Sequence, residues 1–284
     1  AMHCNYKREI FVAQEVAKNN HIPVLLTQHT PSKLPARVRS TADGIVAVSK
    51  KIGEYLTQLN KEEGINGCIA VIPPFFDTKR ITSFEPTPQS RDRYFQENFG
   101  VTLKPCPLLV KVAHLYSNMR HKNHPLLFQA LHELIYKRNT PVQVALVGYG
   151  PKLDAYKKMV HALELDDYVH FLGSTENTSA VFYYADVNVL ASSEEAFGIT
   201  LVEGGFMKKP TIIARSTGAA GWLIIDNQTG FLFEQDNAQD LVNTITHVLA
   251  NQDIAQACAQ KLHNMIVADF LPEQSVKKLI EFYK

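Results

Sequence analysis

The fold is decided by the stretch Val187-Asn188-Val189-Leu190-Ala191-Ser192-Ser193-Glu194-Glu195-Ala196-Phe197-Gly198-Ile199-Thr200-Leu201-Val202-Glu203. Its first four residues form a short, mostly apolar run with two β-branched valines, which is typical of a strand in a buried parallel sheet. Gly198 then provides a turn at which a ligand can approach the backbone closely. The residues after Gly198 continue as a helix, so the stretch predicts one strand–turn–helix unit of an α/β fold.

The same alternation of strands and helices extends outward from this stretch in both directions. Ser49 is a suitable N-cap for a helix in which apolar side chains recur at i, i+3, i+4 and i+7 from Ile52. Further apolar runs that predict strands lie at residues 22–26, 44–48, 68–72, 108–112, 142–147, 169–172 and 210–214. This spacing predicts a doubly wound α/β protein with parallel sheets.

A proline-rich segment from Pro73 to Pro107 interrupts the alternation around one short helix near residues 90–99. Such a composition is typical of a linker between domains. We therefore predict a partial N-terminal domain with its linker over residues 1–105 and a C-terminal domain over residues 106–284. The C-terminal domain is expected to hold a six-stranded parallel sheet.

Composition and charge narrow the class of protein. The chain has 284 residues, with 29 Lys and Arg against 28 Asp and Glu, which gives a net charge of +1. This balance provides no global attraction to nucleic acid, and no run approaches the ~18 apolar residues of a membrane-spanning helix. The sequence begins without a secretory signal pattern, and its four cysteines form no CxxC pair. We therefore expect a cytoplasmic protein with no nucleic-acid partner.

Glu195 and Glu203 lie eight residues apart, one before the expected helix and the other about one turn inside it. Both carboxylates can therefore face one cleft, beside a helix N-terminus whose free N–H groups attract an anion such as a phosphate. The alternative is structural, with Glu195 as a helix cap and Glu203 as a solvated surface residue. The Phe197-Gly198 turn favours the first interpretation.

With Phe197-Gly198 between its two glutamates, the Glu195-x7-Glu203 pattern resembles the E-x7-E signature of retaining glycosyltransferases of family 4, which have the GT-B fold. The resemblance covers nearly the whole chain, because further landmarks of the family stand in order. These are Thr27-Gln28-His29-Thr30, Ala42 to Ser49, Val71 to Asp77, Ala185-Asp186-Val187, Lys209-Pro210 and Asp226 to Leu232. The resemblance implies two Rossmann-like, doubly wound lobes, of which the N-terminal one is incomplete, and a final helix, Pro272 to Tyr283, that crosses back towards the N-terminal lobe.

In such enzymes a nucleotide sugar lies on the C-terminal lobe. The resemblance implies that Glu203 holds the ribose hydroxyls and that Glu195, as a catalytic residue, meets the donor sugar hydroxyls. A carboxylate suits these partners because it accepts two O–H donors at once. The other donor-binding residues implied here are Phe197 and Gly198 beside the sugar, and Ile199 and Thr200 at the helix start, which faces the diphosphate.

The family also places an arginine and a lysine at the diphosphate. Lys122 matches the lysine, whereas His114 stands at the usual place of the arginine. Arg120, in the same loop, is the candidate to replace that arginine, because a neutral histidine gives less charge to a leaving phosphate. The alternative for Lys122 is a solvated loop lysine.

Backbone near Leu172 and Gly173 is implied to read the nucleobase, with the Gly148 turn beside it. Both loops follow strand ends, where open α/β sheets bind ligands, although these glycines also make tight turns whatever the function. His29 is implied to be a second catalytic residue that faces the scissile bond from the acceptor side, and the alternative is a hydrogen-bonded structural histidine. No Asp-x-Asp occurs in the sequence, so we expect no metal and no other cofactor, with Lys122 and the helix N-terminus replacing a metal.

We therefore predict a hexosyltransferase-type glycosyltransferase that moves a sugar from a UDP- or GDP-sugar donor to a glycan, lipid-linked or protein acceptor with retention of configuration. Two alternatives remain: a module that binds a nucleotide or nucleotide sugar without turnover, and another GT-B enzyme such as a nucleotide-sugar epimerase. Family members have further strand–helix units before the point at which this sequence starts. Two explanations remain open: the sequence is a fragment of a longer protein, or a second polypeptide supplies those units. Peripheral association with the cytoplasmic face of a membrane is a further expectation from the family.

Overall fold

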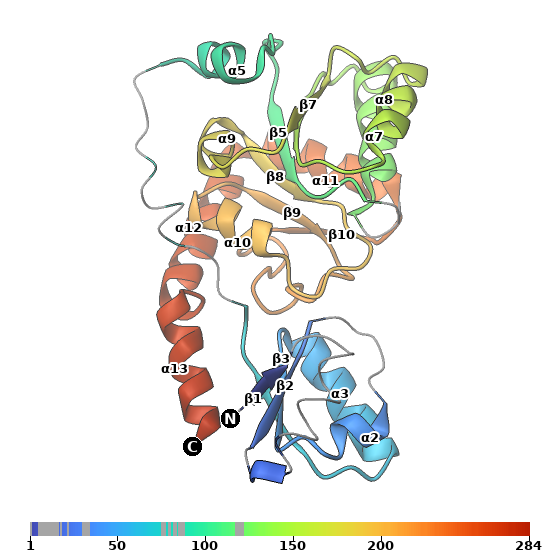
Figure 1. Ribbon diagram of the computed structural model, residues 1–284. Helices are drawn as coiled ribbons and strands as arrows, with labels where there is room; N and C mark the ends of the chain where they lie inside the picture. Colours follow the sequence, from blue (N-terminus) through green and yellow to red (C-terminus); the bar gives the residue numbers. More distant parts are fainter. Residues whose placement is uncertain are drawn as a thin grey trace. The chain divides into compact units, whose positions relative to one another are not determined.

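Figure 1 shows a computed structural model of the chain. The structure describes residues 2–4, 17, 19–21, 23–29, 35–74, 78, 81, 84, 89–116 and 122–284. The chain divides into two compact units, which are described separately below. The small unit consists of Ala1–Phe75 and Asp269–Lys284, and the large unit consists of Phe76–Ala268.

The small unit is built on a parallel four-stranded sheet in the order β1-β2-β3-β4. Its elements are β1 (Met2–Cys4), β2 (Val24–Gln28), α2 (Ala36–Arg39), β3 (Gly44–Ala47), α3 (Lys50–Glu62), β4 (Cys68–Val71) and α13 (Pro272–Tyr283). Ser49 is the N-cap of α3, as predicted, because its hydroxyl accepts a hydrogen bond from the Ile52 amide at 3.3 Å. β3 is buried along its whole length, as expected of an inner strand of a parallel sheet.

The large unit holds a parallel six-stranded sheet in the order β10-β9-β8-β5-β6-β7. Its elements are α5 (Arg91–Phe99), β5 (Leu108–Val112), α7 (His124–His132) with the π-helical turn η1 (Glu133–Lys137), β6 (Gln143–Val147), α8 (Leu153–Ala162), β7 (Val169–Gly173), α9 (Thr178–Tyr184), β8 (Val187–Leu190), α10 (Ile199–Phe206), β9 (Thr211–Ala214), β10 (Phe231–Phe233), α11 (Ala238–Ala250) and α12 (Gln252–Asp269). Starting from β7, the strands follow the 3-2-1-4-5-6 order of a doubly wound sheet, whose winding reverses between β5 and β8.

Helices cover both faces of the large sheet (Figure 1). α7, α8 and α11 pack on one face, where Leu109, Val144 and Val189 belong to one core cluster. α5 and α9 pack on the other face, where Leu108 and Val110 belong to a second cluster. Side chains alternate across a strand, so odd-numbered residues of β5 face α7 and even-numbered residues face α9.

The α/β class and the six-stranded parallel domain agree with the sequence prediction. β1 was not predicted, because three residues are too few to show any hydrophobic period. The compact units also differ from the limits set by the proline-rich segment. α5 precedes residue 105 yet belongs to the large unit, because Tyr94 and Phe95 are buried in its core. α13 belongs to the small unit, where a Cβ atom on Gly44 would lie only 2.7 Å from the Phe282 ring.

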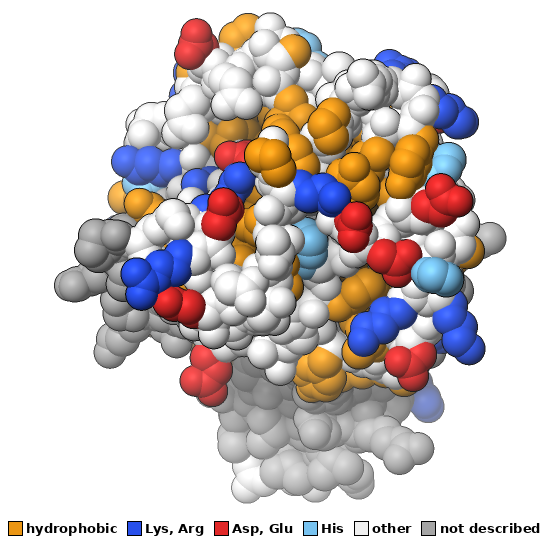
Figure 2. Space-filling view, turned by 90° about the horizontal axis from the view of Figure 1, so that it is seen from above, with side chains coloured by type: hydrophobic (Ala, Val, Ile, Leu, Met, Phe, Trp, Pro, Cys, Tyr) orange, Lys and Arg blue, Asp and Glu red, His pale blue; other side chains and the backbone are white. Residues whose placement is uncertain are grey.

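Surface charge is mixed on the face shown in Figure 2, where basic and acidic side chains are interspersed. That pattern agrees with the net charge of +1 and gives this face no broad field of one sign. Within the described part of the chain, no helix combines the length and the apolar character needed to cross a membrane.

Candidate functional site

Two loops meet where the winding of the large sheet reverses. One loop leaves β5 and contains Lys122, and the other leaves β8 and contains Glu195. Lys122 Nζ donates a hydrogen bond to Glu195 Oε2 at 2.5 Å, although the two residues are 73 positions apart. A basic and an acidic group therefore lie together at the carboxyl end of the sheet, at the place where open α/β sheets bind ligands.

This ion pair is only partly buried. The Lys122 side chain is 34% exposed and the Glu195 side chain 18% exposed. The backbone of Glu195 is fixed, because its carbonyl accepts a hydrogen bond from the Gly218 amide at 2.8 Å. A partly exposed pair of this kind contributes little stability, so both charged groups can turn to a ligand at small cost.

The helix α10 begins directly after the Glu195 turn. Gly198 is its N-cap, with a φ of +96° that favours glycine. The N-cap position is therefore held by Gly198 and not by Glu195. The N-terminus of α10, with its partial positive charge, lies in this same turn.

The remaining predicted residues of this turn lie as follows. Phe197 is 2% exposed and contacts the Trp222 ring at 5.7 Å between centroids, which anchors the turn. Ile199 is exposed, and Thr200 is half-buried with its carbonyl 3.4 Å from Asn188 Nδ2. Glu203 lies in the second turn of α10, half-buried and in contact with other residues of the protein.

A second edge of the site is formed by the ends of β6 and β7. The Gly148 amide donates to the Gly173 carbonyl at 2.8 Å, which brings these two predicted residues and the adjacent Leu172 together. Gly148 has a φ of +145°, and a Cβ atom there would lie 2.0 Å from the Ala113 carbonyl oxygen, so only glycine fits. The loop after β5 is therefore held close to the loop after β6.

Three rings lie beside this edge and were not predicted as a group. His114 lies 5.1 Å from Tyr116 and 5.8 Å from Tyr149, measured between ring centroids. Tyr116 and Tyr149 are 52% and 54% exposed. Exposed aromatic rings offer a stacking surface for a flat ligand. His114, which stands where the family has an arginine, thus belongs to a cluster of three rings with Tyr116 and Tyr149.

Lys111 lies within β5 and is only 1% exposed. Burial lowers its pKa to about 7, and the charge of Lys122 acts in the same direction while Glu195 opposes it. His124 is the first residue of α7, and its pKa is lowered to about 3 by burial and by the charge of Lys111. Its Nε2 lies 3.4 Å from the His114 carbonyl oxygen, and this contact acts in the opposite direction by raising the pKa. The sequence offered one signal for Lys111, a lone lysine in an otherwise apolar strand.

Two further predicted residues are His29 and Arg120. His29 follows β2 directly and is exposed, but it belongs to the small unit. Arg120 lies outside the described residues. Over the described ranges, no group of three or more His, Cys, Asp or Glu side chains is arranged to hold a metal ion.

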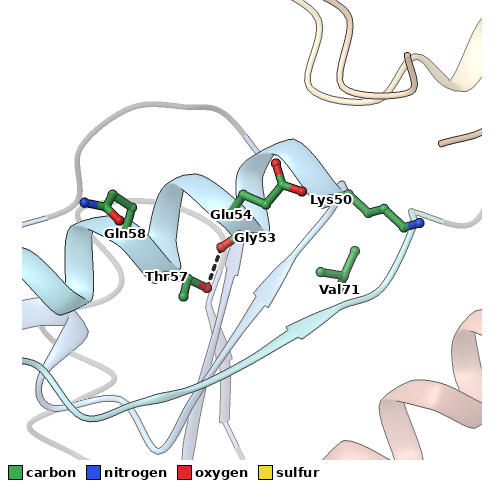
Figure 3. A pocket seen from close by; sticks show the side chains of 6 residues that line it. All are labelled: Lys50, Gly53, Glu54, Thr57, Gln58 and Val71. Carbon is green, nitrogen blue, oxygen red and sulfur yellow. Dashed lines mark hydrogen bonds between the residues drawn. The ribbon is translucent and has the colours of Figure 1, made fainter. Parts of the chain in front are cut away.

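A surface hollow of about 390 Å³ lies elsewhere, in the small unit (Figure 3). Its lining comes from α3 and from Val71 of β4, and the Thr57 hydroxyl donates to the Gly53 carbonyl at 2.8 Å. Lys50, Glu54 and Gln58 project from successive turns of α3 around it. None of the predicted site residues lines this hollow, and its groups do not converge on one point, so we do not identify it with the functional site.

The large unit is thus a doubly wound α/β domain with an ion pair and a helix N-terminus at its switch point, the place where such domains bind ligands. The sequence pattern of the family described as "Glycosyl transferases group 1" matches residues 106–265, more than half of the chain. The chain belongs to this family.

Curated relatives are distant and longer than the matching part. The chain is 25% identical over 141 residues to N-acetyl-alpha-D-glucosaminyl L-malate synthase of Bacillus anthracis, covering 50% of this chain and 37% of that protein. It is 24% identical over 256 residues to a GDP-mannose-dependent alpha-(1-6)-phosphatidylinositol monomannoside mannosyltransferase of Mycobacterium tuberculosis, covering 87% and 64%. The matches span only 35–38% of the first three curated relatives.

Solved structures confirm the GT-B fold class. Anabaena Alr3699/HepE in complex with UDP superposes with a TM-score of 0.82 at 20% identity, covering 99% of this chain and 77% of that one. A glycosyltransferase from Rickettsia africae superposes with a TM-score of 0.78 at 21% identity, covering 100% and 83%. At these identities the likeness defines the architecture, an α/β protein with two Rossmann-like lobes.

Proposed function

We propose that the chain is a retaining glycosyltransferase of family 4 that transfers a hexose from a UDP- or GDP-sugar to an acceptor hydroxyl on a glycan, lipid-linked or protein substrate. The observation that carries this proposal is the Lys122–Glu195 pair at the switch point, beside the start of α10, whose N-cap is Gly198. Membership of the group 1 family and the E-x7-E pattern support it. The names of the relatives support either base, because the HepE structure holds UDP and the mycobacterial relative is GDP-mannose-dependent.

Each side chain of the cluster has a role in this proposal. Lys122 and the amides of Ile199 and Thr200 bind the diphosphate, because an ammonium and a helix N-terminus both favour anions. Glu195 accepts hydrogen bonds from the sugar hydroxyls, and Glu203 accepts them from the ribose. Leu172, Gly173 and Gly148 border the nucleobase. The small unit supplies the acceptor side, where His29 is the candidate to face the scissile bond.

The chemistry needs a stabilised leaving group. The bond between the anomeric carbon and the phosphate oxygen breaks, the acceptor oxygen bonds to the same carbon, and the acceptor proton leaves with a phosphate oxygen or a base. Negative charge grows on the diphosphate in this step, and preorganised positive groups lower the barrier by stabilising that charge. Lys122 and the α10 amides supply those groups here without a metal.

Incubation with UDP- and GDP-sugars labelled in the hexose tests the proposal. We expect label in an acceptor product whose anomeric configuration, read by NMR coupling constants, equals that of the donor. Label that stays on the nucleotide would identify a binding module, and an epimerised donor would identify an epimerase. A product of inverted configuration would overturn the retaining assignment alone.

A further inference from the structure

Lys111 differs from the other residues of its strand. β5 is the central strand at the switch point, and its residues are otherwise apolar. Lys111 occupies an odd-numbered position, so it lies on the face covered by α7, between Leu109 of the core cluster and the loop that leads to Lys122. A lysine is almost never buried this completely without a partner.

The titratable groups around Lys111 come from two segments of the chain. Lys122 and His124 stand at the start of α7, and Glu195 follows β8. Leu146 of β6 pairs with Lys111 in the sheet and is apolar. Among the described residues no acceptor lies within hydrogen-bonding distance of Lys111 Nζ, whereas Lys122 Nζ is bonded to Glu195. Glu195, the carboxylate of this cluster, is therefore hydrogen-bonded to Lys122 and not to Lys111.

A buried ammonium without an acceptor favours the neutral amine, and a neighbouring positive charge strengthens that preference. Burial and the charge of Lys122 together lower the pKa of Lys111 to about 7. A nearby anion acts in the opposite direction. A diphosphate bound beside Lys122 would bring several negative charges towards the buried Lys111, and a buried charge is screened less by solvent than an exposed one.

We propose that Lys111 is a second cation of the donor site, which takes up a proton when the diphosphate of a nucleotide binds beside Lys122. This inference rests on the proposed function. It also accounts for the departure at His114, because a protonated Lys111 restores the positive charge that an arginine would give. Lys111 acts through the electrostatic potential of the site and is a positioning residue, not a catalytic one.

The test is isothermal titration of the whole chain with UDP, GDP and inorganic pyrophosphate in two buffers of different ionisation enthalpy. The difference in heat gives the number of protons taken up. At about pH 8, a group with a pKa of about 7 is mostly neutral, so we expect an uptake of roughly 0.9 proton per ligand bound. Affinity should fall up to ~10-fold per pH unit above about pH 7.

Lys111→Met removes the charge at similar volume and should reduce the uptake at about pH 8 to nearly zero. Its affinity should be weaker than that of the wild type near pH 6.5 and nearly independent of pH. Lys209→Met is the matched control, because Lys209 is another lysine whose pKa is lowered by burial, and its ammonium donates to the Tyr183 carbonyl instead. This variant should retain the wild-type proton uptake.

The outcomes separate the two proposals. Binding without proton uptake in the wild type, or equal uptake in wild type and Lys111→Met, overturns the role of Lys111 and leaves the proposed function intact. The wild-type measurement decides this even if the variant fails to fold. Absence of binding by all three ligands near pH 6.5 overturns the proposed function, and the inference with it.

Discussion

Among the described residues, each unit buries one long cationic side chain completely, but the two cations have different surroundings. Arg39 in the small unit is 0% exposed, and its Nε donates to Asn60 Oδ1 at 2.8 Å while its guanidinium pairs with Glu63. Lys111 in the large unit is 1% exposed and has no such acceptor among the described residues. Breaking a paired buried charge is costly, whereas an unpaired buried lysine is itself a cost to folding. On the proposal made above, Arg39 serves the fold and Lys111 serves a ligand.

The largest expected effect is a gain of stability in Lys111→Met. The pKa of Lys111 is about 7 in the folded protein and 10.5 as the unperturbed value. Its lowered pKa means that the unfolded chain binds the proton more tightly, so folding is penalised fully below about pH 7 and not at all above about pH 10.5. Removing the lysine should raise the free energy of unfolding by up to roughly 5 kcal/mol at about pH 6.

Chemical denaturation of wild type and Lys111→Met at about pH 6, 8 and 10 measures this gain. The stabilisation should shrink steadily as the pH rises. A variant that is less stable than the wild type at about pH 6, or a difference that does not change with pH, would show that Lys111 already has a satisfactory partner in the fold.

Arg39→Met should have the opposite sign. It leaves Asn60 and the Glu63 carboxylate without their cation, and Glu63 is only 22% exposed. We expect a loss of about 3 kcal/mol in the free energy of unfolding, at the low end for a broken buried pair because Glu63 still reaches water. Nucleotide affinity should not change, since Arg39 lies in the small unit.

Glu63→Gln provides the control for Arg39→Met, and the two substitutions together should cost less than the sum of the single ones. Strict additivity would mean that the pair does not act as a unit, and Arg39 would then lose its structural assignment in the comparison with Lys111.

The sequence predicted the framework of both units because their inner strands are continuous apolar runs, as β3 and β5 illustrate. It did not predict β1, whose pairing with β2 is a tertiary event over three residues. Glu195 and Lys122 were expected at one site through the family resemblance, but their direct contact joins positions 73 apart, which no local pattern reveals. Lys111 was visible as a lysine in a strand, yet its burial depends on which face α7 covers.

Glu203→Ala should weaken binding without the loss of stability expected for Arg39→Met. If Glu203 holds the ribose, the change removes charge-assisted hydrogen bonds worth about 1.5–3 kcal/mol, or ~10- to 150-fold in affinity. UDP and UDP-sugar, or GDP and GDP-sugar, should be affected alike, because the ribose is common to both. Isothermal titration with each pair measures this, together with a melting temperature as the stability control. A lowered melting temperature with unchanged affinities would show that Glu203, like Arg39, stabilises the fold and does not bind the nucleotide.

The smallest expected effect is that of Glu195→Ala. Glu195 differs from both buried cations because it bonds to Lys122 in the structure and, in the proposal, accepts hydrogen bonds from the donor sugar. Glu195 accepts a hydrogen bond from Lys122 in the structure, so removing its carboxylate leaves that ammonium available to the diphosphate. A partly exposed pair is worth about 0–1 kcal/mol, and affinity for UDP or GDP should therefore stay equal or rise by up to about fivefold.

The nucleotide sugar should respond in the opposite direction, because its sugar loses the acceptor that Glu195 provides. The quantity to measure is the ratio of the two affinities, nucleoside diphosphate against nucleotide sugar, in wild type and variant. Glu194→Ala is the matched control, an exposed neighbour at which the ratio should not change. If Glu195→Ala weakens both ligands equally, the carboxylate holds the turn rather than the sugar. The exchange of Lys122 between protein and ligand would then not occur.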